Sequence, residues 1–578
     1  NYYYFDAKPG IAYDLYTTST LDTQGTLYDA DKNRLGYDDN SGLENNFAFV
    51  QSYDGRRYLK VGTKGTATGS YTLSLRKRFA VPVLTGKEGQ DSYIVSWNAI
   101  DKAKEYLVTI YDAGGRIGDA IVTETSYEYV YTNETAGKTL AFTVTPRENA
   151  ELTGEESRRI YNTNRDSKWH YDTPMLQSRI NFASTVCGGK IYVLGGEDKD
   201  TSAVFRDLEV FEPEKQTWTK VSEYPGNAAG TRDAGIVNAR MVTVGGKLYV
   251  FGGQTDTSTL ARTIKEAYCY DPDSARWTRL ADLSEGRTEM PVTVLDGKIY
   301  IFAKAGSTER VDVYDPKEDT WSSDVKADTS TNLQARTVDG RIFVLREKEA
   351  ENKELPAKMY WEEYLPETGE YDNAGEICSF ANADQYLSGA VVNGKIYMVN
   401  NRETSQVICY DVYLDQWSQL SVFNLKKSCS KLQSVGTTLY SLGGFMQGFG
   451  TLDVVEAYEL ETVQITKQLE VVKGEDYELQ VDAGNCEEDT DYLVTVRIDP
   501  SVLSFSRTSS FMQRKKFEQG RDGIQLVHYA PKKGVIVVKL RGKMETGDTI
   551  QAYQSIPAAG LKNETTVVSM EIQNGKKQ

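Results

Sequence analysis

Histidine is rare in this chain: only His170 and His528 occur among its 578 residues. Copper and catalytic zinc centres usually take two or more imidazole ligands, and a Ser-His-Asp triad needs an imidazole base. Two histidines so far apart in the sequence argue against all three kinds of site. The simplest role for His170 is that of a surface or inter-repeat residue.

Paired cysteines and long apolar runs are missing as well. The six cysteines are scattered without a Cys-x-x-Cys pair, which argues against a disulfide scaffold or a cysteine-rich zinc site. We expect them to be buried as small apolar groups. No run of about 18 apolar residues occurs, so the sequence predicts no transmembrane helix. Neither a P-loop nor a dinucleotide-binding fingerprint is present.

Positive charge is outweighed, since 66 Lys and Arg residues stand against 83 Asp and Glu residues and give a net charge of −17. Nucleic acids and anionic membrane surfaces require clustered basic residues, so we expect neither as a partner, and no membrane insertion. The chain is rich in Tyr and Gly, with 38 and 48 residues. This composition is typical of an all-β protein with many turns, and the length predicts about three or four domains.

One hairpin phrase recurs along the middle of the chain, first as "GGKIYVLGG" at residues 188–196. The aromatic residue after each Gly-Lys turn recurs at a spacing near the ~50 residues of a propeller blade, at Tyr192, Tyr249, Tyr300, Phe343, Tyr397 and Tyr440. A later strand of each unit ends in a turn and a second aromatic residue: Trp218, Trp277, Trp321, Tyr371 and Trp417. This pattern resembles the kelch repeat, which implies a β-propeller whose blades bury both faces against their neighbours.

The sixth unit, "TLDVVEAYELETV", lacks the terminal tryptophan, and a matching phrase, "SKWHYDTPM", stands ahead of the first unit. We therefore expect a six-bladed propeller over residues 163–462 that is closed by the N-terminal strand around Trp169. The glycine pair at the end of the recurring phrase is present in three of the six units, at 195–196, 252–253 and 443–444. Blades three to five are expected to be irregular for that reason.

Three β-sandwich domains are expected around the propeller. Residues 1–78, with "DTQGTLYDADKNRLGYDD" and "GSYTLSL", resemble the bacterial pre-peptidase C-terminal (PPC) domain, which usually has one more strand upstream; we therefore expect an upstream region and a signal to be missing here. Residues 79–162, with "DSYIVSWNAIDKAKEYLVTIYD", resemble a fibronectin type III domain with Trp97 and Phe142 in its core. Residues 463–578, with "IDPSVLSF", resemble cohesin-like or carbohydrate-module sandwiches.

The candidate site is the mouth of the propeller. In kelch proteins the residues that lead into the innermost strands face the channel opening and often contact the ligand. Here they form one ring of Asn181, Asn238, Glu289, Asn332, Tyr386 and Cys429, and a second ring, two residues earlier, of Arg179, Ile236, Arg287, Ser330, Asp384 and Lys427. Our ligand-binding set is Arg179, Asn181, Asn238, Arg287, Glu289, Asn332, Tyr386 and Lys427. Arg179 and Arg287 suit an anionic group, and the alternative is that the set only satisfies backbone groups.

A second candidate site is a calcium loop at Asp29, Asp31 and Asn33. The sixth position of this loop is Arg34 instead of Gly and the twelfth is Asn40 instead of Glu, so it departs from the EF-hand pattern. A hairpin turn is the preferred interpretation, with structural calcium as the alternative. Apart from that calcium, the sequence predicts no cofactor.

These observations predict a non-catalytic recognition or adhesion protein, outside the cell or on a bacterial surface, that binds a glycan or a protein on the propeller face. We expect it to be a monomer. Among propeller enzymes, copper oxidases resembling galactose oxidase need more imidazoles, and the Ser-x-Asp-x-Gly-x-Thr-Trp box of sialidases is missing. The enzyme alternative is a metal-free sugar-converting activity resembling sialate mutarotase, and a third alternative is a structural spacer.

Overall fold

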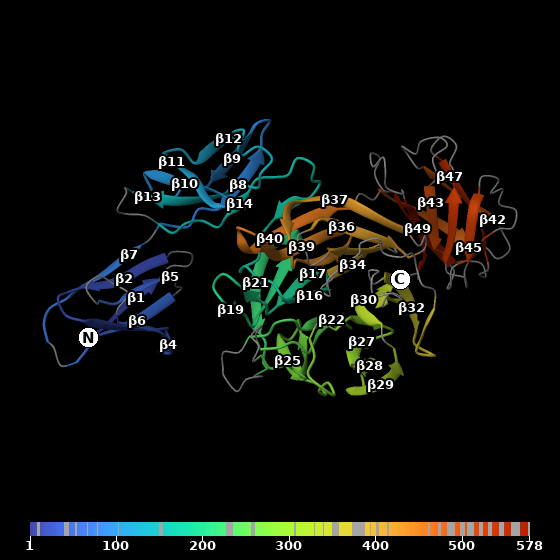
Figure 1. Cartoon of the computed structure of the whole chain (residues 1–578), viewed down its shortest axis with the longest axis horizontal. Helices are drawn as coiled ribbons and strands as arrows, with labels where there is room; N and C mark the ends of the chain where they lie inside the picture. The colour runs from blue at the N-terminus through green and yellow to red at the C-terminus, as the bar shows by residue number, and fades with distance from the viewer. Residues whose placement is uncertain are drawn as a thin grey trace. The chain divides into compact units, whose positions relative to one another are not determined.

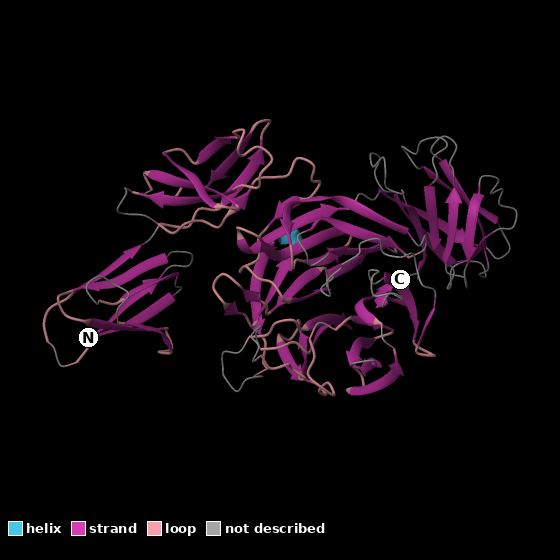
Figure 2. Cartoon of the chain, viewed as in Figure 1, coloured by secondary structure: helices cyan, strands magenta, loops and turns pink. Residues whose placement is uncertain are grey.

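The computed structural model describes most of the chain up to residue 460, and beyond it only the backbone of the strands. The described ranges are 1–7, 12–39, 46–52, 55–65, 68–77, 79–101, 103–148, 154–226, 235–255, 261–288, 290–305, 308–328, 330–338, 340–348, 358–372, 388–392, 395–399, 404–412 and 416–460. The chain divides into two compact units, Asn1–Asn164 and Arg165–Gln578. Figure 2 shows that the regular structure of the described chain is almost entirely strand, and no described helix is long and apolar enough to cross a membrane.

The first domain is a sandwich of two antiparallel sheets. One has the order β1-β6-β3-β4 and the other β5-β2-β7. The strands are β1 (Tyr2–Ala7), β2 (Ala12–Thr18), β3 (Thr23–Tyr28), β4 (Arg34–Asp38), β5 (Ala48–Ser52), β6 (Gly55–Thr63) and β7 (Thr72–Lys77). Alternating residues such as Leu27, Leu59 and Val61 fill the core, as half-buried antiparallel strands require. Its relationship to the PPC domain stays a prediction.

The second domain is a sandwich of a four-stranded sheet, β11-β10-β13-β14, and a three-stranded sheet, β12-β9-β8. The strands are β8 (Leu84–Glu88), β9 (Ser92–Trp97), β10 (Glu105–Asp112), β11 (Gly115–Val122), β12 (Ser126–Val130), β13 (Ala141–Arg147) and β14 (Ile160–Tyr161). Trp97 and Phe142 are both buried in the core between the sheets, as the alternation of their strands predicts. The assignment to fibronectin type III stays a prediction.

Six four-stranded sheets follow, each antiparallel and each one blade of a propeller (Figure 1). The innermost strands are β16 (Ala183–Cys187), β22 (Arg240–Val244), β26 (Val292–Leu295), β30 (Thr331–Val338), β34 (Ser388–Val392) and β38 (Lys431–Val435). The second strands are β17 (Lys190–Leu194), β23 (Lys247–Phe251), β27 (Lys298–Ala305), β31 (Arg341–Lys348), β35 (Lys395–Val399) and β39 (Thr438–Met446). The third strands are β20 (Asp207–Glu212), β24 (Ala267–Asp271), β28 (Thr308–Asp315), β32 (Lys358–Leu365), β36 (Thr404–Asp411) and β40 (Gly450–Glu459).

The outer strands complete the blades and close the ring. Blades one to five end in β21 (Thr217–Glu223), β25 (Arg276–Arg279), β29 (Thr320–Ala327), β33 (Glu370–Asp372) and β37 (Gln416–Lys427), while the outer strand of blade six is β15 (His170–Asp172). A 3-10 turn (Pro213–Lys215) and a small hairpin, β18 (Glu197–Asp198) with β19 (Ala203–Val204), belong to blade one. His170 lies opposite Ala457 on β40. The last blade thus takes its outer strand from the segment ahead of the first blade, and β16 contacts β38, so the toroid is closed.

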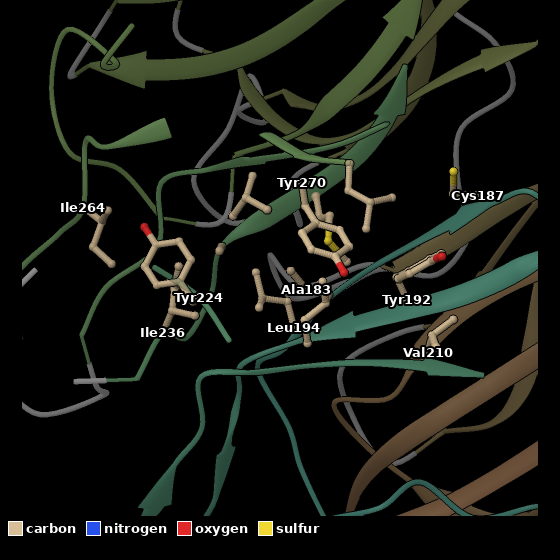
Figure 3. Packing of buried hydrophobic residues seen from close by; sticks show 14 residues of the cluster. Ala183, Cys187, Tyr192, Leu194, Val210, Tyr224, Ile236, Ile264 and Tyr270 are labelled. Atoms are coloured by element: carbon tan, nitrogen blue, oxygen red, sulfur yellow. The ribbon is translucent and has the colours of Figure 1, made fainter. Parts of the chain in front are cut away.

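Alternation along β17 explains why the recurring phrase is apolar throughout. Ile191 and Val193 pack in a cluster with blade six, whereas Tyr192 and Leu194 pack in a cluster with blade two. Figure 3 shows Tyr192 and Leu194 in the second cluster, together with Tyr270 of blade two. Because the side chains of a strand point to opposite faces in turn, a sheet covered on both faces needs a continuous apolar run.

Tryptophan indoles form hydrogen bonds between neighbouring blades. The indole N–H of Trp169 donates to Ser421 O on blade five at 3.1 Å. That of Trp218 donates to Thr173 O at 2.9 Å, and that of Trp277 to the Ser222 hydroxyl at 2.9 Å. A fourth, Trp321, donates to Ala281 O at 3.0 Å. The repeated tryptophan therefore combines burial of a large ring with one directional contact across a blade interface.

Glycine pairs follow the second strands of blades one and two and form a bulge within that of blade six, because another backbone passes against each pair. A Cβ on Gly195 would lie 2.2 Å from Ile236 O, and one on Gly252 would lie 2.5 Å from Arg287 O. A Cβ on Gly443 would lie 2.6 Å from Arg179 O. All three glycines have positive φ, so both the backbone conformation and the close approach require glycine.

Blades three and four differ from this pattern. Strands β27 and β28 stay paired out to Ala305 and Thr308, and β31 and β32 out to Lys348 and Lys358. Their second strands carry Ala303 and Arg346 where blades one, two and six have the first glycine of the pair. The hairpin formed by the second and third strands is therefore longer and regularly paired in these two blades, where the sequence predicted an irregularity. The corresponding residues of blade five lie outside the described ranges.

A third sandwich follows the propeller. One sheet has the order β41-β48-β49-β43-β46-β45 and the other β42-β47-β44. The strands are β41 (Val463–Val471), β42 (Asp476–Asp482), β43 (Tyr492–Arg497), β44 (Leu503–Phe505), β45 (Arg514–Gln519), β46 (Ile524–Tyr529), β47 (Val535–Gly542), β48 (Asp548–Ile556) and β49 (Val567–Gly575). Strands β43 and β49 pair in parallel. The cohesin-like or carbohydrate-module assignment of residues 463–578 stays a prediction.

Candidate functional site

The segments that lead into the innermost strands do not present their basic residues to a ligand. The side chain of Arg179 is fully buried and ion-paired with the equally buried Glu209 of β20. Its Nη1 also donates to Gly195 O at 2.8 Å. Burial lowers the pKa of Arg179 and raises the pKa of Glu209, because it disfavours both charged forms. This is a correction to the expected anion-binding role: Arg179 holds its own blade together.

Two more members of the predicted set make the same kind of pair. The fully buried Lys427 lies 2.9 Å from Glu456 of β40, and neither side chain is exposed. Arg287, whose side chain is 10% exposed, lies 2.7 Å from Asp312 of β28. The three carboxylates occupy equivalent positions in the third strands of blades one, three and six. The basic residues therefore belong to a repeated pair inside the blade, since a buried cation needs a charged partner.

The asparagines of the predicted set hold the backbone turn that precedes the innermost strand. Asn181, Asn238 and Cys429 have φ of 56°, 57° and 58°, a region that Asn tolerates better than most residues. The side-chain amide of Asn181 donates to Glu197 at 2.8 Å, and the N–H of Asn238 donates to Asn181 O at 2.7 Å. Both side chains are half-buried, so their ligand-binding role stays a prediction. Glu289, Tyr386 and Asp384 lie outside the described residues.

Blade four carries its buried cation at a different place. Arg346, at the position of the missing glycine, donates to Glu362 at 2.9 Å, to Asp328 at 2.5 Å and to Asn332 Oδ1 at 3.0 Å. Asn332 in turn donates to Glu309 of blade three at 2.6 Å. Asn332, predicted to bind a ligand, is thus part of a charged network between two blades.

The candidate calcium loop is a hairpin turn between β3 and β4. The N–H of Asn33 donates to Asp29 Oδ1 at 2.8 Å, and its side-chain amide donates to Oδ2 at 2.9 Å. These bonds lower the pKa of Asp29 and engage both of its carboxylate oxygens. The backbone of Asp31 also bonds to the Asp29 carboxylate. These contacts account for the turn, and the calcium-binding role of the loop stays a prediction. Among the described residues, no three His, Cys, Asp or Glu side chains group as metal ligands.

A cavity of about 480 Å³ lies in the central channel of the propeller. Its lining comes from the innermost strands of all six blades, β16, β22, β26, β30, β34 and β38. A volume of this size is within the ~300–1,000 Å³ range of small-molecule sites. The closed ring of blades therefore builds a site that no single blade contains.

Polar side chains inside the channel bridge neighbouring blades. The hydroxyls of Thr185 and Thr243 lie 3.3 Å apart across blades one and two. The hydroxyls of Thr293 and Thr337 lie 2.8 Å apart across blades three and four. The amide of Gln433 in blade six donates to the Ser184 hydroxyl in blade one at 2.8 Å. The wall thus offers hydroxyl and amide groups whose remaining hydrogen-bonding capacity can face a ligand.

Three cations also line the cavity: Arg240, Arg336 and Lys431. The Nε of Arg240 donates to Met290 O at 2.9 Å, and the guanidinium of Arg336 donates to Ala335 O at 2.7 Å and to Gly389 O at 2.8 Å. Burial, together with the charge of Arg240, lowers the pKa of Arg336 to about 10. The channel is accordingly a polar site with positive charge, and it can bind but has no described nucleophile–base pair.

These channel residues were not predicted from the sequence, because the predicted site consisted of residues in the segments that lead into the innermost strands. The innermost strands themselves carried a usable signal, since Arg240 and Lys431 occupy the same repeat position, opposite the residue that precedes the glycine pair. Blade one has Ala183 there. A basic residue thus recurs at one position of the innermost strand in two of the six blades.

Comparison with known proteins agrees with this architecture. The family model described as "KLHDC2/KLHL20/DRC7 Kelch-repeats domain" matches residues 162–345. The propeller is built from kelch repeats. Two similar relatives are Kelch-like protein 25 of Xenopus tropicalis, 25% identical over 42% of this chain and 41% of its own length, and Kelch-like protein 35 of Mus musculus, 27% identical over 40% and 38%. The chain thus spans about two fifths of the length of these two relatives.

A third relative of the kelch propeller is the N-(sulfonatooxy)prop-2-enimidothioate sulfolyase of Thlaspi arvense. It is 26% identical over 49% of this chain and 77% of its own length. Among solved structures, that of YjhT matches with a TM-score of 0.39 and 12% sequence identity, over 50% of this chain and 95% of that one. Kelch repeats in the relatives named Kelch-like point to a role in recognition or protein interaction.

Proposed function

We propose that this chain is a non-catalytic recognition or adhesion protein, outside the cell or on a bacterial surface, that binds a glycan or protein ligand at the hub of its propeller. The observation that carries the proposal is the cavity lined by the innermost strands of all six blades. Threonine and serine hydroxyls, glutamine amides and three cations line it, a set suited to a ligand with several polar groups. The sandwiches that flank the propeller fit a protein that displays one binding domain.

A chosen pair of substitutions tests the hub. Ser434→Trp places a large ring in the channel wall, whereas Val221→Trp places the same ring on an exposed part of the outer strand β21. The full chain is screened against a glycan array and a purified-protein display, and the best ligand is titrated. We expect Ser434→Trp to weaken binding at least tenfold and Val221→Trp to leave it unchanged. Equal binding by both variants, with melting temperatures like that of the parent, contradicts the proposal.

A second candidate function is an enzyme on the same face, and the sulfolyase relative favours it. That relative aligns over 77% of its length, and its name describes a substrate with a sulfonatooxy group. A channel with three cations fits an anionic substrate of that class. Release of sulfate from an aryl or thiohydroximate sulfate by the full chain, lost in Ser434→Trp, supports the enzyme, whereas binding without turnover supports the recognition protein.

A further inference from the structure

The hub channel concentrates positive charge in a protein that is acidic overall. The chain has a net charge of −17, yet the described residues that line the cavity include Arg240, Arg336 and Lys431 and no Asp or Glu. Chance composition would favour carboxylates in the lining, since these outnumber the basic residues of the chain. The sign of the charge is thus reversed in the cavity that all six blades line.

The three cations come from three separate blades and share one side of their strands. Arg240 pairs opposite Phe251 and Lys431 opposite Leu442, the residues just before the glycine pairs. In blade four the equivalent residue is Gln334, opposite Leu345, and Arg336 lies two residues farther along the strand. Because side chains alternate with a period of two residues, all three project from the same face of their strands.

The described groups that Arg336 contacts do not compensate its positive charge. Its two described bonds go to backbone carbonyls, Ala335 O and Gly389 O, which accept hydrogen bonds but carry no net charge. Burial and the nearby charge of Arg240 both disfavour the charged guanidinium and lower its pKa. An anion placed among the three cations reverses this penalty, since opposite charges attract strongly at low effective dielectric.

The cavity also limits the size and chemistry of the occupant. About 480 Å³ accommodates a small molecule but no folded segment. Guanidinium groups bind the planar or tetrahedral oxygens of carboxylate, sulfate and phosphate through paired hydrogen bonds. The hydroxyls of Thr185 and Thr293 and the amide of Gln433 offer donors and acceptors to the remainder of the molecule.

We propose that the hub channel binds a small, hydroxyl-bearing organic anion whose carboxylate, sulfate or phosphate group is held by Arg240, Arg336 and Lys431. This inference rests on the proposed function, because it names the ligand class of the same hub. It differs in one respect that can be tested separately: it requires a negative charge on the ligand.

Four probes with one sugar ring separate the possibilities. Glucuronate, glucose 6-sulfate and glucose 6-phosphate carry the three anionic groups, and glucose is the neutral control. The full chain is titrated with each by calorimetry at low ionic strength. We expect at least one anion to bind at least tenfold more tightly than glucose and to raise the melting temperature of the propeller as ligand is added. The anion that binds best identifies the group.

Matched variants assign the binding to the channel. Arg336→Gln is expected to weaken binding of the best anion at least tenfold, since hydrogen bonds between two charged groups are stronger than those between neutral ones; Arg336→Lys, which keeps the charge, should weaken it less. Arg276→Gln, an exposed arginine on β25, should leave affinity unchanged. If Arg336→Gln does not fold, Lys431→Gln at the start of β38 replaces it. Unchanged affinity in both channel variants overturns the inference.

The outcomes also separate this inference from the proposed function. If glucose or a neutral glycan binds as tightly as the anions and Ser434→Trp abolishes that binding, the hub recognises ligands but the anion inference is overturned. If no anionic probe saturates, the anion inference is overturned as well. If, in addition, Ser434→Trp weakens the binding of no ligand of any kind, both proposals are contradicted.

Discussion

Blades one, two and six differ from blades three and four at the place where the second strand meets the next blade. The first group has a glycine there, because the carbonyl of the next blade's lead-in segment occupies the space of a Cβ; this glycine follows the strand in blades one and two and forms a bulge within it in blade six. The second group has Ala303 or Arg346 there, and its strand continues into a longer hairpin without a bulge. The buried cation of the blade therefore comes from the lead-in segment in blades one, three and six and from the second strand itself in blade four. One fold thus tolerates two solutions to the same packing problem.

The comparison predicts the largest effect for Gly195→Ala. The added Cβ would lie 2.2 Å from Ile236 O in a backbone with φ of 66°, so either the blade interface or the turn must move. We expect a loss of more than about 3 kcal/mol in unfolding free energy, combining αL strain with overpacking. Calorimetric or chemical unfolding of the full chain measures this effect.

Gly189→Ala is the matched control for that prediction. Gly189 has φ of 71°, but no atom lies within 4 Å of the Cβ position, so only the conformational strain of about 1–2 kcal/mol remains. Equal losses at the two glycines would contradict the close-approach explanation of the glycine pairs.

Arg346→Gly gives blade four the glycine of the other group and is expected to cost about 3–5 kcal/mol. The substitution leaves Glu362 and Asp328 near one another without their cation, and removing one partner of a buried pair is strongly destabilising. Ala303→Gly in blade three makes the same exchange without a charge and should cost about 1 kcal/mol or less. Unfolding curves of the two variants give the comparison, and similar losses would mean that the charge of Arg346 is not what blade four needs.

The acid stability of the network in blade four should depend on Asp328. Burial acts to raise the pKa of this carboxyl group, but the bonds from Arg346 and Ser330 outweigh it and hold the pKa at about 2, against 3.8 for the free group. A lowered pKa in the folded state stabilises the protein above pH 4 by about 2 kcal/mol, and that contribution is lost as the pH falls from 4 to 2.

Asp328→Asn should remove this contribution at neutral pH and flatten the loss of stability between pH 4 and pH 2. Glu370→Gln, on the exposed edge strand β33 of the same blade, is the control. A variant whose acid unfolding curve coincides with that of the parent would show that Asp328 does not titrate in this range.

The repeat could be predicted from the sequence because a similar apolar run recurs in each blade. The closure of the ring could be predicted because the strand around Trp169 precedes the first blade and matches the part that the sixth unit lacks. The role of Arg179 and Lys427 could not be predicted in the same way. Their partners, Glu209 and Glu456, lie on third strands some distance along the chain, and only the fold brings each pair together. A carboxylate inside an apolar strand, as in "DLEVF" and "DVVEAY", was the available signal.

The channel cations illustrate a second limit. Arg240, Arg336 and Lys431 lie in strands whose sequences look like ordinary blade strands, and their common surroundings emerge only when six strands meet around one axis. Aligning the repeats by their glycine pairs places two of the three at one position, but the third is displaced by two residues. The sequence therefore holds part of the site and the toroid supplies the rest.

A crystal structure of the full chain with the tightest-binding anion of the four-probe panel tests the central claim most directly. The account predicts the ligand inside the channel, with its anionic oxygens within hydrogen-bonding distance of Arg336 and of at least one of Arg240 and Lys431. A ligand seated on the outside of the propeller or on a sandwich domain, with the channel holding only solvent, would contradict it.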